Sequence, residues 1–245
     1  MINPCIVIPI YNHKATIADV LDQLAQFGLP CIVVDDGSDL ATRHVLEEQD
    51  KHRPWVQVLH RPQNGGKGEA VKTGLQRADE IGYSHALQID ADGQHDTRDI
   101  PRFLAEAEAY PQALVLGKPA FGADAPLSRR VGRRISQFLV WVDTLSLAIG
   151  DPLTGFRVYP VRTAVALMQQ QRLGPCMDFD PEIAVRLHWR SVPIRNVVTA
   201  VIYPQDGSSH FRVVRDNVRL GWLYTRLFFG MLCRVPCLLR MKRSP

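Results

Sequence analysis

Two aspartates separated by one residue, Asp90 and Asp92, follow an apolar run of the sequence. At the end of a strand, carboxylates at this spacing turn toward one point, where a hard divalent cation takes oxygen ligands and bridges to a diphosphate. Gly93 permits a tight turn after them, and the amide oxygen of Gln94 offers a further ligand. The pattern predicts a metal site at Asp90, Asp92 and Gln94, with an acidic turn that binds no metal as the alternative.

A second acidic pair, Asp35 and Asp36, follows another apolar run. Adjacent residues of an extended segment point in opposite directions, so these two carboxylates do not easily share one metal ion. One of them is expected to accept hydrogen bonds from a base or a ribose. The alternative is a helix start at this point, with Ser38 or Asp39 as its N-cap, and both roles are compatible.

A glycine-rich segment, GGKG at residues 65–68, carries Lys67. A Walker A loop requires Ser or Thr after its lysine and a glycine where this chain has Arg61, and a dinucleotide fingerprint requires a glycine where it has Val71. Both of these motifs are therefore excluded. The segment is either an anion-tolerant loop that enters a helix or a plain structural turn.

The elements that must position these groups alternate between apolar runs and amphipathic segments, which predicts a wound α/β sheet. Several runs are apolar throughout, as expected in a mostly parallel sheet that helices cover on both faces. We expect strands at residues 5–10, 31–34, 56–59, 86–89 and 113–116, with helices between them. The motifs at residues 9–12, 35–38, 65–68 and 90–94 should then converge on one crevice at the carboxyl ends of the strands.

Beyond Gly117 the pattern changes without a linker or an independent domain. We expect a long helix from Ser128, a strand at residues 156–159, helices at residues 161–171 and 180–188, a strand at residues 192–202 and a terminal helix from Val213. The prediction is therefore one domain at residues 1–212, with residues 1–117 and 118–212 as its halves, followed by an amphipathic basic helix at residues 213–245.

Length and composition fit this single domain. The chain has 245 residues, 46% of them hydrophobic and 22% charged, which excludes a disordered, collagen-like or multi-span membrane protein. Its net charge of +4 combines −7 for residues 1–117 with +11 for residues 118–245, where all but two of the 19 cationic residues are arginine. Because guanidinium binds phosphate bidentately, the second half is expected to meet an anionic partner, with a solvated basic surface as the alternative.

The five cysteines form no C-x-x-C pair, and two of them lie in apolar runs, which indicates reduced, buried thiols in a cytosolic compartment. The first residues lack the basic and long apolar stretches of a secretory signal, so none is expected.

Residues 220–239 are rich in apolar and aromatic side chains, but Arg226 and Arg234 interrupt them and Pro236 kinks the helix, so they do not form a convincing membrane span. The arginines gather on one helical face and aromatic residues cover the remainder. This is typical of a helix in an anionic membrane interface, with Trp222 and Tyr224 near the headgroups. The alternative is a helix packed on the sheet, with arginines that extend to solvent.

Four motifs in order resemble family 2 glycosyltransferases of the GT-A fold: IPIYN at residues 8–12, VVDDGS at 33–38, NGGKG at 64–68 and DADGQ at 90–94. Within that family the chain looks most like the dolichyl-phosphate mannosyltransferase and polyprenyl-phosphate sugar transferase branch. The likeness continues through DPLTGFR at residues 151–157 and FDPE at 179–182. It implies a single-domain GT-A fold in which residues 1–117 bind the nucleotide sugar and residues 118–212 bind the acceptor.

The resemblance implies an inverting transfer of a hexose from a UDP- or GDP-sugar, with Mg²⁺ or Mn²⁺ neutralising the departing nucleoside diphosphate. The nucleotide-sugar contacts it implies are Pro9, Tyr11, Asn12, Asp35, Asp36, Lys67, Asp90 and Ala91. The metal ligands would be Asp90, Asp92 and Gln94. The residues assigned to catalysis are Asp92, Arg157 and Glu182.

In that branch the nucleophile is an acceptor phosphate, which is largely ionised near pH 7 and needs little help from a base. The cations expected around it are Lys118, Arg129, Arg130, Arg133, Arg134 and Arg157, and a helix N-terminus adds its positive end. A solvated basic helix face is the alternative. The chain departs from the family at residues 117–119, which read GKP where Gly-Ser-Arg is frequent.

A hydroxyl acceptor, in cell-envelope glycan or glycolipid synthesis, would instead require a general base, for which Asp178, Asp180 and Glu182 are candidates. A sugar nucleotidyltransferase and a non-catalytic subunit that binds nucleotide sugars are two further hypotheses. The expected partners are a nucleotide sugar, a lipid-phosphate or other lipid-linked acceptor and an anionic membrane surface, without nucleic acid. The expected location is cytoplasmic, at the inner face of the cell membrane.

Overall fold

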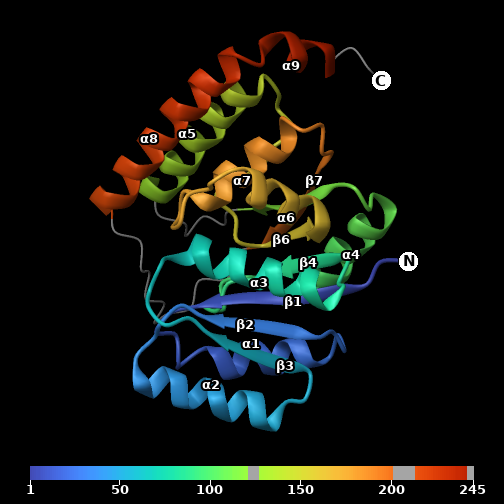
Figure 1. The fold of residues 1–245 in the computed structure, drawn as a ribbon, viewed down its shortest axis with the longest axis vertical. Coiled ribbons are helices and arrows are strands. Elements are labelled where there is room, and N and C mark those ends of the chain that lie inside the picture. The colour runs from blue at the N-terminus through green and yellow to red at the C-terminus, as the bar shows by residue number, and fades with distance from the viewer. Residues whose placement is uncertain (121–126, 201–212, 242–245) are drawn as a thin grey trace.

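The computed structural model describes residues 1–120, 127–200 and 213–241, and for residues 127–129, 213–214 and 241 it describes the backbone alone. Seven strands form one sheet in the order β3-β2-β1-β4-β6-β5-β7. Helices cover both faces of this sheet (Figure 1). The α/β class and the wound, mostly parallel sheet predicted from the sequence are confirmed.

The elements follow the predicted order within a few residues. The first half consists of β1 (Pro4–Ile10), α1 (Ile17–Ala25), β2 (Cys31–Asp35), α2 (Leu40–His52), β3 (Val56–His60), α3 (Lys67–Ile81), β4 (His85–Gln88), a 3₁₀ turn (Thr97–Asp99) and α4 (Ile100–Ala109). The second half consists of β5 (Leu114–Ala120), α5 (Leu127–Thr144), β6 (Arg157–Pro160), α6 (Val161–Gln170), α7 (Phe179–His188), β7 (Ile194–Ala200), α8 (Val213–Leu232) and α9 (Val235–Met241).

The hydrophobic core lies in two layers, one on each face of the sheet. Successive side chains of a strand point to opposite faces, so Cys5 and Val7 of β1 enter one layer while Ile6 and Ile8 enter the other. All four are completely buried. This explains the continuously apolar strands, because a strand covered on both faces has no side that tolerates polar residues.

Strand β6 runs antiparallel to both of its neighbours, β4 and β5. Its first residue, Arg157, is paired with Gln88 at the carboxyl end of β4. The chain that enters β6, residues 151–156, therefore lies beside Asp90, which stands just beyond that end. The reversed strand brings the second half of the chain to the metal-binding motif of the first half.

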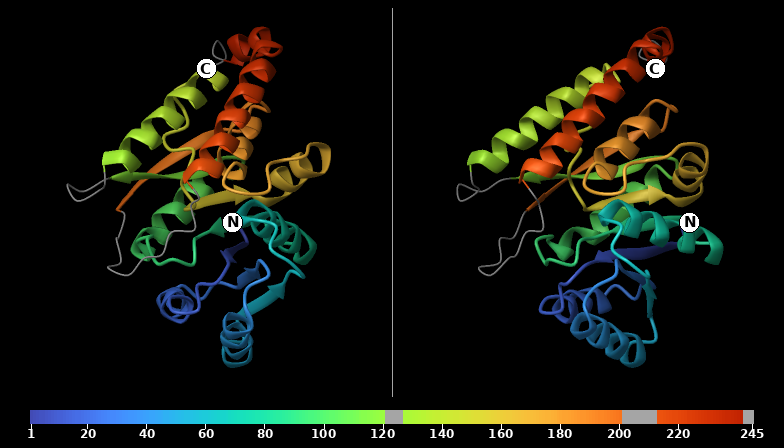
Figure 2. Two further views of the ribbon diagram at one scale, coloured as in Figure 1. Left: turned by 90° about the vertical axis from the view of Figure 1, so that its left-hand side faces the viewer. Right: turned by 60° about the vertical axis from the view of Figure 1, so that its left-hand side comes forward.

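The long helices α5 and α8 lie side by side in both views of Figure 2. Leu223 and Leu227 of α8 are buried, so the terminal helix packs on the domain. Helix α5 buries polar residues, Ser136 and Asp143 among them, whereas its apolar residues Val131, Ile135 and Phe138 are 46, 56 and 61% exposed. Within the described ranges, none of the helices has both the length and the apolar content needed to cross a membrane.

The cysteines correct one expectation. All five are unpaired, and Cys5 and Cys31 are buried in β1 and β2 as expected. Cys233 and Cys237 near the end of the chain are exposed, however, and Cys176 is half-buried. Their positions outside the strands explain the difference, because only strand residues are covered by both core layers.

Candidate active site

A cavity of about 390 Å³, here called the sheet-end cavity, opens at the carboxyl ends of the parallel strands. It is lined by the segments that follow β1, β2 and β4, by the glycine-rich loop before α3, by residues 175–177 and by the start of α8. The predicted residues among its lining are Pro9, Tyr11, Asp36, Lys67, Asp90, Ala91 and Asp92. The strand-end motifs thus converge as the topology requires.

Asp36 fixes the glycine-rich loop at the edge of this cavity. Its carboxylate accepts hydrogen bonds from the backbone nitrogens of Gly65 (3.1 Å) and Gly66 (2.7 Å) and pairs with Arg61. Gly66 has a φ of 101°, a conformation that favours glycine. The position of the glycine-rich loop therefore depends on Asp36.

Asp35 points away from the cavity, as expected for the neighbour of Asp36 on an extended strand. It is completely buried and accepts hydrogen bonds from the Ser38 backbone nitrogen (2.9 Å) and the His60 ring (2.8 Å). Burial raises the pKa of Asp35, but these hydrogen bonds outweigh it and leave the pKa lowered. Asn12 also lies outside the cavity lining, and its side-chain oxygen accepts from the Asp39 nitrogen at 2.9 Å. Both residues support the loops of the cavity.

Two charged side chains of the lining, Lys67 and Asp90, form a cluster with the buried Asp180 behind them. The Lys67 ammonium lies 2.9 Å from Asp90 Oδ1 and 3.1 Å from Asp180 Oδ2. Burial opposes ionisation of Asp90, but the nearby Lys67 charge holds its pKa well below the usual range. Burial likewise opposes the charge of Lys67, and the carboxylates of Asp180 and Asp90 raise its pKa above the usual value. Lys67 and Asp90 therefore stay charged near neutral pH.

The carboxylates of Asp90 and Asp92 fit a divalent cation. Both line the cavity, and Asp90 Oδ1 is buried without a hydrogen bond, although the Lys67 ammonium lies nearby. Gly155 leaves room for Asp90, since a Cβ atom there would collide with its carboxylate. The described residues contain no cluster of three acidic, His or Cys side chains suited to a metal. Two carboxylates with remaining ligands from a diphosphate and water are the usual arrangement for Mg²⁺.

Gln94 does not line the sheet-end cavity. Its backbone nitrogen donates to Asp92 Oδ1 at 3.0 Å, so this residue orients the aspartate through its main chain. His95 lies closer to the wall, with Nε2 3.4 Å from Asp90 Oδ2.

A second cavity of about 310 Å³, here called the arginine cavity, lies at the start of α5. Its lining is Lys118, Pro119, Arg130, Arg133, Arg134, Gln137, Gly150 and Asp151. Four cations face one carboxylate, and Arg133 forms an ion pair with Asp151. Four of the six cations predicted for an acceptor phosphate therefore meet in one cavity. The side chain of Arg129 lies outside the described residues.

Arg157, the sixth predicted cation, lines neither cavity and is completely buried. Its guanidinium donates to the carbonyl oxygens of Asp180 (2.9 Å), Pro152 (3.3 Å) and Thr154. Burial opposes its charge, but the surrounding oxygens, those of Tyr159 and Asp180 first, leave its pKa raised. The structure thus places Arg157 under the segment at residues 151–155, where it holds this segment against α7.

Glu182 is also completely buried and lines neither cavity. Its carboxylate accepts hydrogen bonds from the Gly174 nitrogen (2.7 Å), Arg186 Nε (2.8 Å) and Arg226 Nη2 (2.7 Å). These contacts join α7 to the loop before it and to α8.

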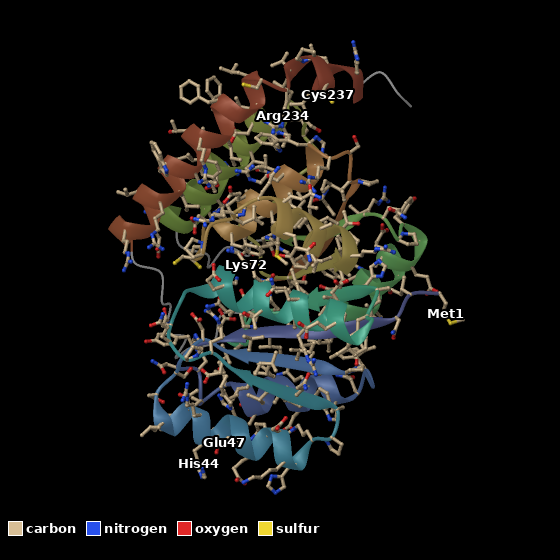
Figure 3. All side chains as sticks on the ribbon, in the orientation of Figure 1. Met1, His44, Glu47, Lys72, Arg234 and Cys237 are labelled. Carbon is tan, nitrogen blue, oxygen red and sulfur yellow. The ribbon has the colours of Figure 1, made fainter. Side chains whose placement is uncertain are left out.

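The arginines of the terminal helix contact the protein. Arg219 donates to the Cys176 sulfur, and Arg226 pairs with Glu182. Just after α8, Arg234 (labelled in Figure 3) places its guanidinium 4.7 Å from the ring centre of Trp189. The helical periodicity correctly predicted that these arginines lie close to one face. That face contacts α7 and the loop before it. Trp222 and Phe229, 69 and 63% exposed, point away from the core.

Helix α8 contributes to the sheet-end cavity, which was not predicted from the sequence. Arg215, Asp216 and Arg219 line it together with Cys176 and Met177. The spacing of Arg215 and Arg219, four residues apart on a helix, could have indicated a shared anion contact. From the sequence we expected this arginine face to meet lipid headgroups. The spacing of residues on a helix does not show which neighbour its face contacts.

The chain is similar to proteins named as dolichyl-phosphate sugar transferases. The chain is 26% identical to UDP-N-acetylglucosamine–dolichyl-phosphate N-acetylglucosaminyltransferase of Methanococcus voltae, over 79% of this chain and 85% of the other. It is 27% identical to dolichyl-phosphate beta-glucosyltransferase of Dictyostelium discoideum, over 89% and 74% of the two chains.

A solved structure shares the fold at low identity. A mannosyltransferase of Pyrobaculum calidifontis in complex with GDP-Man and Mn²⁺ superimposes with a TM-score of 0.58 at 16% identity, over 84% of this chain and 58% of the other. Residues 5–162, more than half of the chain, match the family described as Glycosyl transferase family 2. The chain therefore belongs to glycosyltransferase family 2 and is a glycosyltransferase with the GT-A fold.

Proposed function

We propose that this enzyme transfers a hexose from a UDP- or GDP-sugar in the sheet-end cavity to a polyprenyl phosphate or related lipid phosphate in the arginine cavity. One observation carries this proposal: the cavity lined by the carboxylate pair Asp90 and Asp92 and the cavity with four cations lie at the two ends of the segment at residues 151–155. The first suits a metal-bound diphosphate, and the second suits a phosphate without a metal. The named relatives that use dolichyl phosphate support the acceptor class.

The residues of the sheet-end cavity would bind the donor. Asp36 sets the glycine-rich loop and offers its carboxylate edge to a base or ribose, while Pro9, Tyr11 and Ala91 supply wall contacts. Asp90 and Asp92 would hold Mg²⁺ or Mn²⁺, which when bound neutralises the charge that develops on the departing diphosphate. Lys67 keeps Asp90 ionised and in place before substrate arrives.

The residues of the arginine cavity would hold the acceptor phosphate. Arg130, Arg134 and Lys118 supply positive charge, and Arg133 would exchange its partner Asp151 for a phosphate oxygen. That oxygen forms the new bond to the anomeric carbon on the face opposite the leaving group, so the configuration inverts. The bond between the anomeric carbon and the diphosphate oxygen breaks, and its electron pair leaves with the diphosphate.

The positions of the acidic residues favour a phosphate acceptor over a hydroxyl acceptor. A hydroxyl needs a general base within hydrogen-bond reach. Among the described residues, the three candidates Asp178, Asp180 and Glu182 line neither cavity. Asp178 accepts from the Cys176 nitrogen at 2.9 Å, Asp180 pairs with Lys67, and Glu182 is held by two arginines.

The exposed apolar residues of α5 and α8 support association with the inner membrane face, where a lipid acceptor would be reached. Helix α5 exposes the apolar side chains of Val131, Ile135 and Phe138 and buries the polar Ser136 and Asp143, the reverse of a helix that faces water. Trp222 and Phe229 of α8 add aromatic side chains suited to an interface. The enzyme would bind a cytoplasmic membrane surface through these helices without crossing it.

The test supplies the purified enzyme with radiolabelled UDP- and GDP-sugars, Mn²⁺ or Mg²⁺, and polyprenyl phosphate in vesicles. The expected product is organic-phase label that mild acid releases, and Asp92→Ala should abolish it. Asp99→Ala, outside both cavities, is the matched control. Acid-stable label would contradict the phosphate acceptor. Release of pyrophosphate would identify a nucleotidyltransferase. A protein that binds the donor but shows neither transfer nor slow hydrolysis of the donor would be a non-catalytic subunit.

Arg134→Ala tests the acceptor side separately. Loss of one charge-assisted contact should raise the KM for polyprenyl phosphate about tenfold or more and leave the KM for the nucleotide sugar unchanged. Arg98, whose side chain is fully open to water on the other half of the molecule, provides the control Arg98→Ala. An equal rise in both KM values would contradict the assignment of the arginine cavity to the acceptor.

A further inference from the structure

The terminal helix contributes two cations to the sheet-end cavity. Arg215 and Arg219 line it from the first turns of α8, across from the strand-end carboxylates. Figure 1 shows the N-terminal end of α8 on the side of the sheet to which β1 and β2 point. Residues separated by four positions share one helical face, so the two guanidinium groups can act on one ligand.

The other cations nearby, Lys67 in the lining and Arg61 beside Asp36, are already paired with carboxylates. Lys67 lies between Asp90 and Asp180, and Arg61 pairs with Asp36 and lies 3.7 Å from Glu69. Their charges compensate buried carboxylates, so they add little net attraction for an anionic ligand.

Arg215 and Arg219 carry no such carboxylate partner among the described residues. Arg219 donates to the Cys176 sulfur, and burial raises the pKa of this thiol, with Arg219 acting in the opposite direction. A protonated thiol does not neutralise the charge of Arg219. Asp216, the acidic neighbour in the same lining, is buried, whereas Arg215 is exposed.

A departing nucleoside diphosphate gains one negative charge when the sugar leaves. The metal carboxylates Asp90 and Asp92 already offset much of the charge of a divalent cation, so the diphosphate needs further positive groups nearby. Arginine suits this because its planar fork binds phosphate oxygens bidentately and stays charged.

We infer that Arg219, assisted by Arg215, binds the diphosphate of the nucleotide-sugar donor and stabilises it as it departs. The inference rests on the proposed function, because it assumes that the sheet-end cavity holds the donor. It assigns α8 to the donor site, whereas the sequence indicated either a membrane-interface helix or a helix packed on the sheet.

Calorimetric titration of the full chain with UDP, UMP and uridine, and with GDP, GMP and guanosine, in the presence of Mn²⁺ tests this inference. Arg219→Ala should weaken binding of the preferred diphosphate about tenfold or more while nucleoside binding changes less than twofold. Arg219→Lys should recover part of the loss, because it restores the charge without the fork. Arg240→Ala on α9, outside both cavities, is the matched control.

The outcomes separate the inference from the proposed function. Wild-type enzyme that binds no nucleoside diphosphate overturns both. Wild-type enzyme that binds diphosphate, together with an Arg219→Ala variant that binds it equally well, overturns the inference alone. An equal loss for nucleoside and diphosphate would show a structural role and also overturn it. If Arg219→Ala does not fold, Arg215→Ala gives the same comparison at an exposed position of the same lining.

Discussion

Lys67 of α3 holds its ammonium nitrogen 2.9 Å from a carboxylate oxygen of Asp90, just beyond the end of β4. The same nitrogen lies 3.1 Å from Asp180, so one cation joins the proposed metal motif to α7. A charge of this kind is costly to bury and becomes favourable only through its partners. Lys67, Asp90 and Asp180 therefore stabilise the fold only when all three are present, and the loss of one leaves a buried charge without its partner.

Removal of Lys67 should accordingly cost more than the loss of one surface charge. Lys67→Met leaves Asp90 and Asp180 without their shared cation and should lower the free energy of unfolding by about 3 kcal/mol or more. Adding Asp90→Asn to that variant should restore part of the loss. Urea unfolding of the two single variants and the double variant measures this coupling, and additive losses would show that the contact is energetically unimportant.

Gly155 should be required for the position of Asp90. In Gly155→Ala the added methyl group collides with the Asp90 carboxylate. We expect the Mn²⁺ concentration needed for half-maximal transfer to rise about tenfold or more, because one metal ligand moves. Gly221→Ala in α8 is the control, since nothing lies within 4 Å of the added atom. An unchanged metal requirement in Gly155→Ala would argue against Asp90 as a ligand.

Asp143, buried between α5 and its neighbours, should make stability depend on pH. Burial raises its pKa from 3.8 to about 7, so the folded chain retains a proton that the unfolded chain has lost between these values. Its contribution to stability is thus full below about pH 4, falls as the pH rises to about 7, and stays lost above that.

Replacement by an uncharged isostere should remove this dependence. Asp143→Asn is expected to raise the free energy of unfolding by up to about 4 kcal/mol at pH 8, with little change at pH 4. Thermal unfolding of both proteins across this range provides the measurement. A gain of the same size at both pH values would mean that the carboxyl does not titrate in the folded state.

Substitution of Glu182 tests whether this residue has a structural role or acts as a general base. Glu182→Gln keeps the shape but weakens the contacts to Arg186 and Arg226, so stability should fall by about 2 kcal/mol or more. Transfer by the folded fraction should remain within a few-fold of wild type, and the pH profile of kcat should not shift. A loss of more than about a hundredfold in kcat with normal stability would instead support a base and a hydroxyl acceptor.

The exposed aromatic residues of α8 should govern membrane binding. The double variant Trp222→Ser and Phe229→Ser should weaken binding to anionic vesicles about tenfold or more, because each ring removes apolar area from the interface. Sedimentation with vesicles measures this. Leu40→Ser on α2, an exposed apolar residue on the opposite half of the sheet, is the control. Equal binding by all three proteins would remove α8 from the membrane contact.

The order of the elements and most of the sheet-end cavity could be predicted from the sequence. Strands such as β1 and β2 are apolar throughout, and the carboxyl ends of parallel strands must meet, which correctly brought Asp36, Asp90 and Asp92 together. The opposite directions of Asp35 and Asp36 followed from the pleat alone.

What could not be predicted depended on contacts between distant segments. The antiparallel direction of β6 and the burial of Arg157 arise from pairing across the sheet, which leaves no local pattern. Arginine spacing on α8 showed a shared face but not that Arg219 meets Cys176. Likewise, the apolar stripe of α5 at Val131 and Ile135 resembles a core-facing stripe, although the structure exposes it.

The segment at residues 151–155 joins the two cavities, and this bears on which parts of such an enzyme can change during evolution. Asp151 stands in the arginine cavity, Gly155 rests on Asp90, and the buried Arg157 fastens the carbonyl groups of Pro152 and Thr154. The distance between nucleophile and leaving group would thus be set by a short, internally clamped spacer. In the proposed function the sugar, the base and the lipid tail would contact the surrounding walls, so mutations there could change substrate preference without changing the distance that this segment sets.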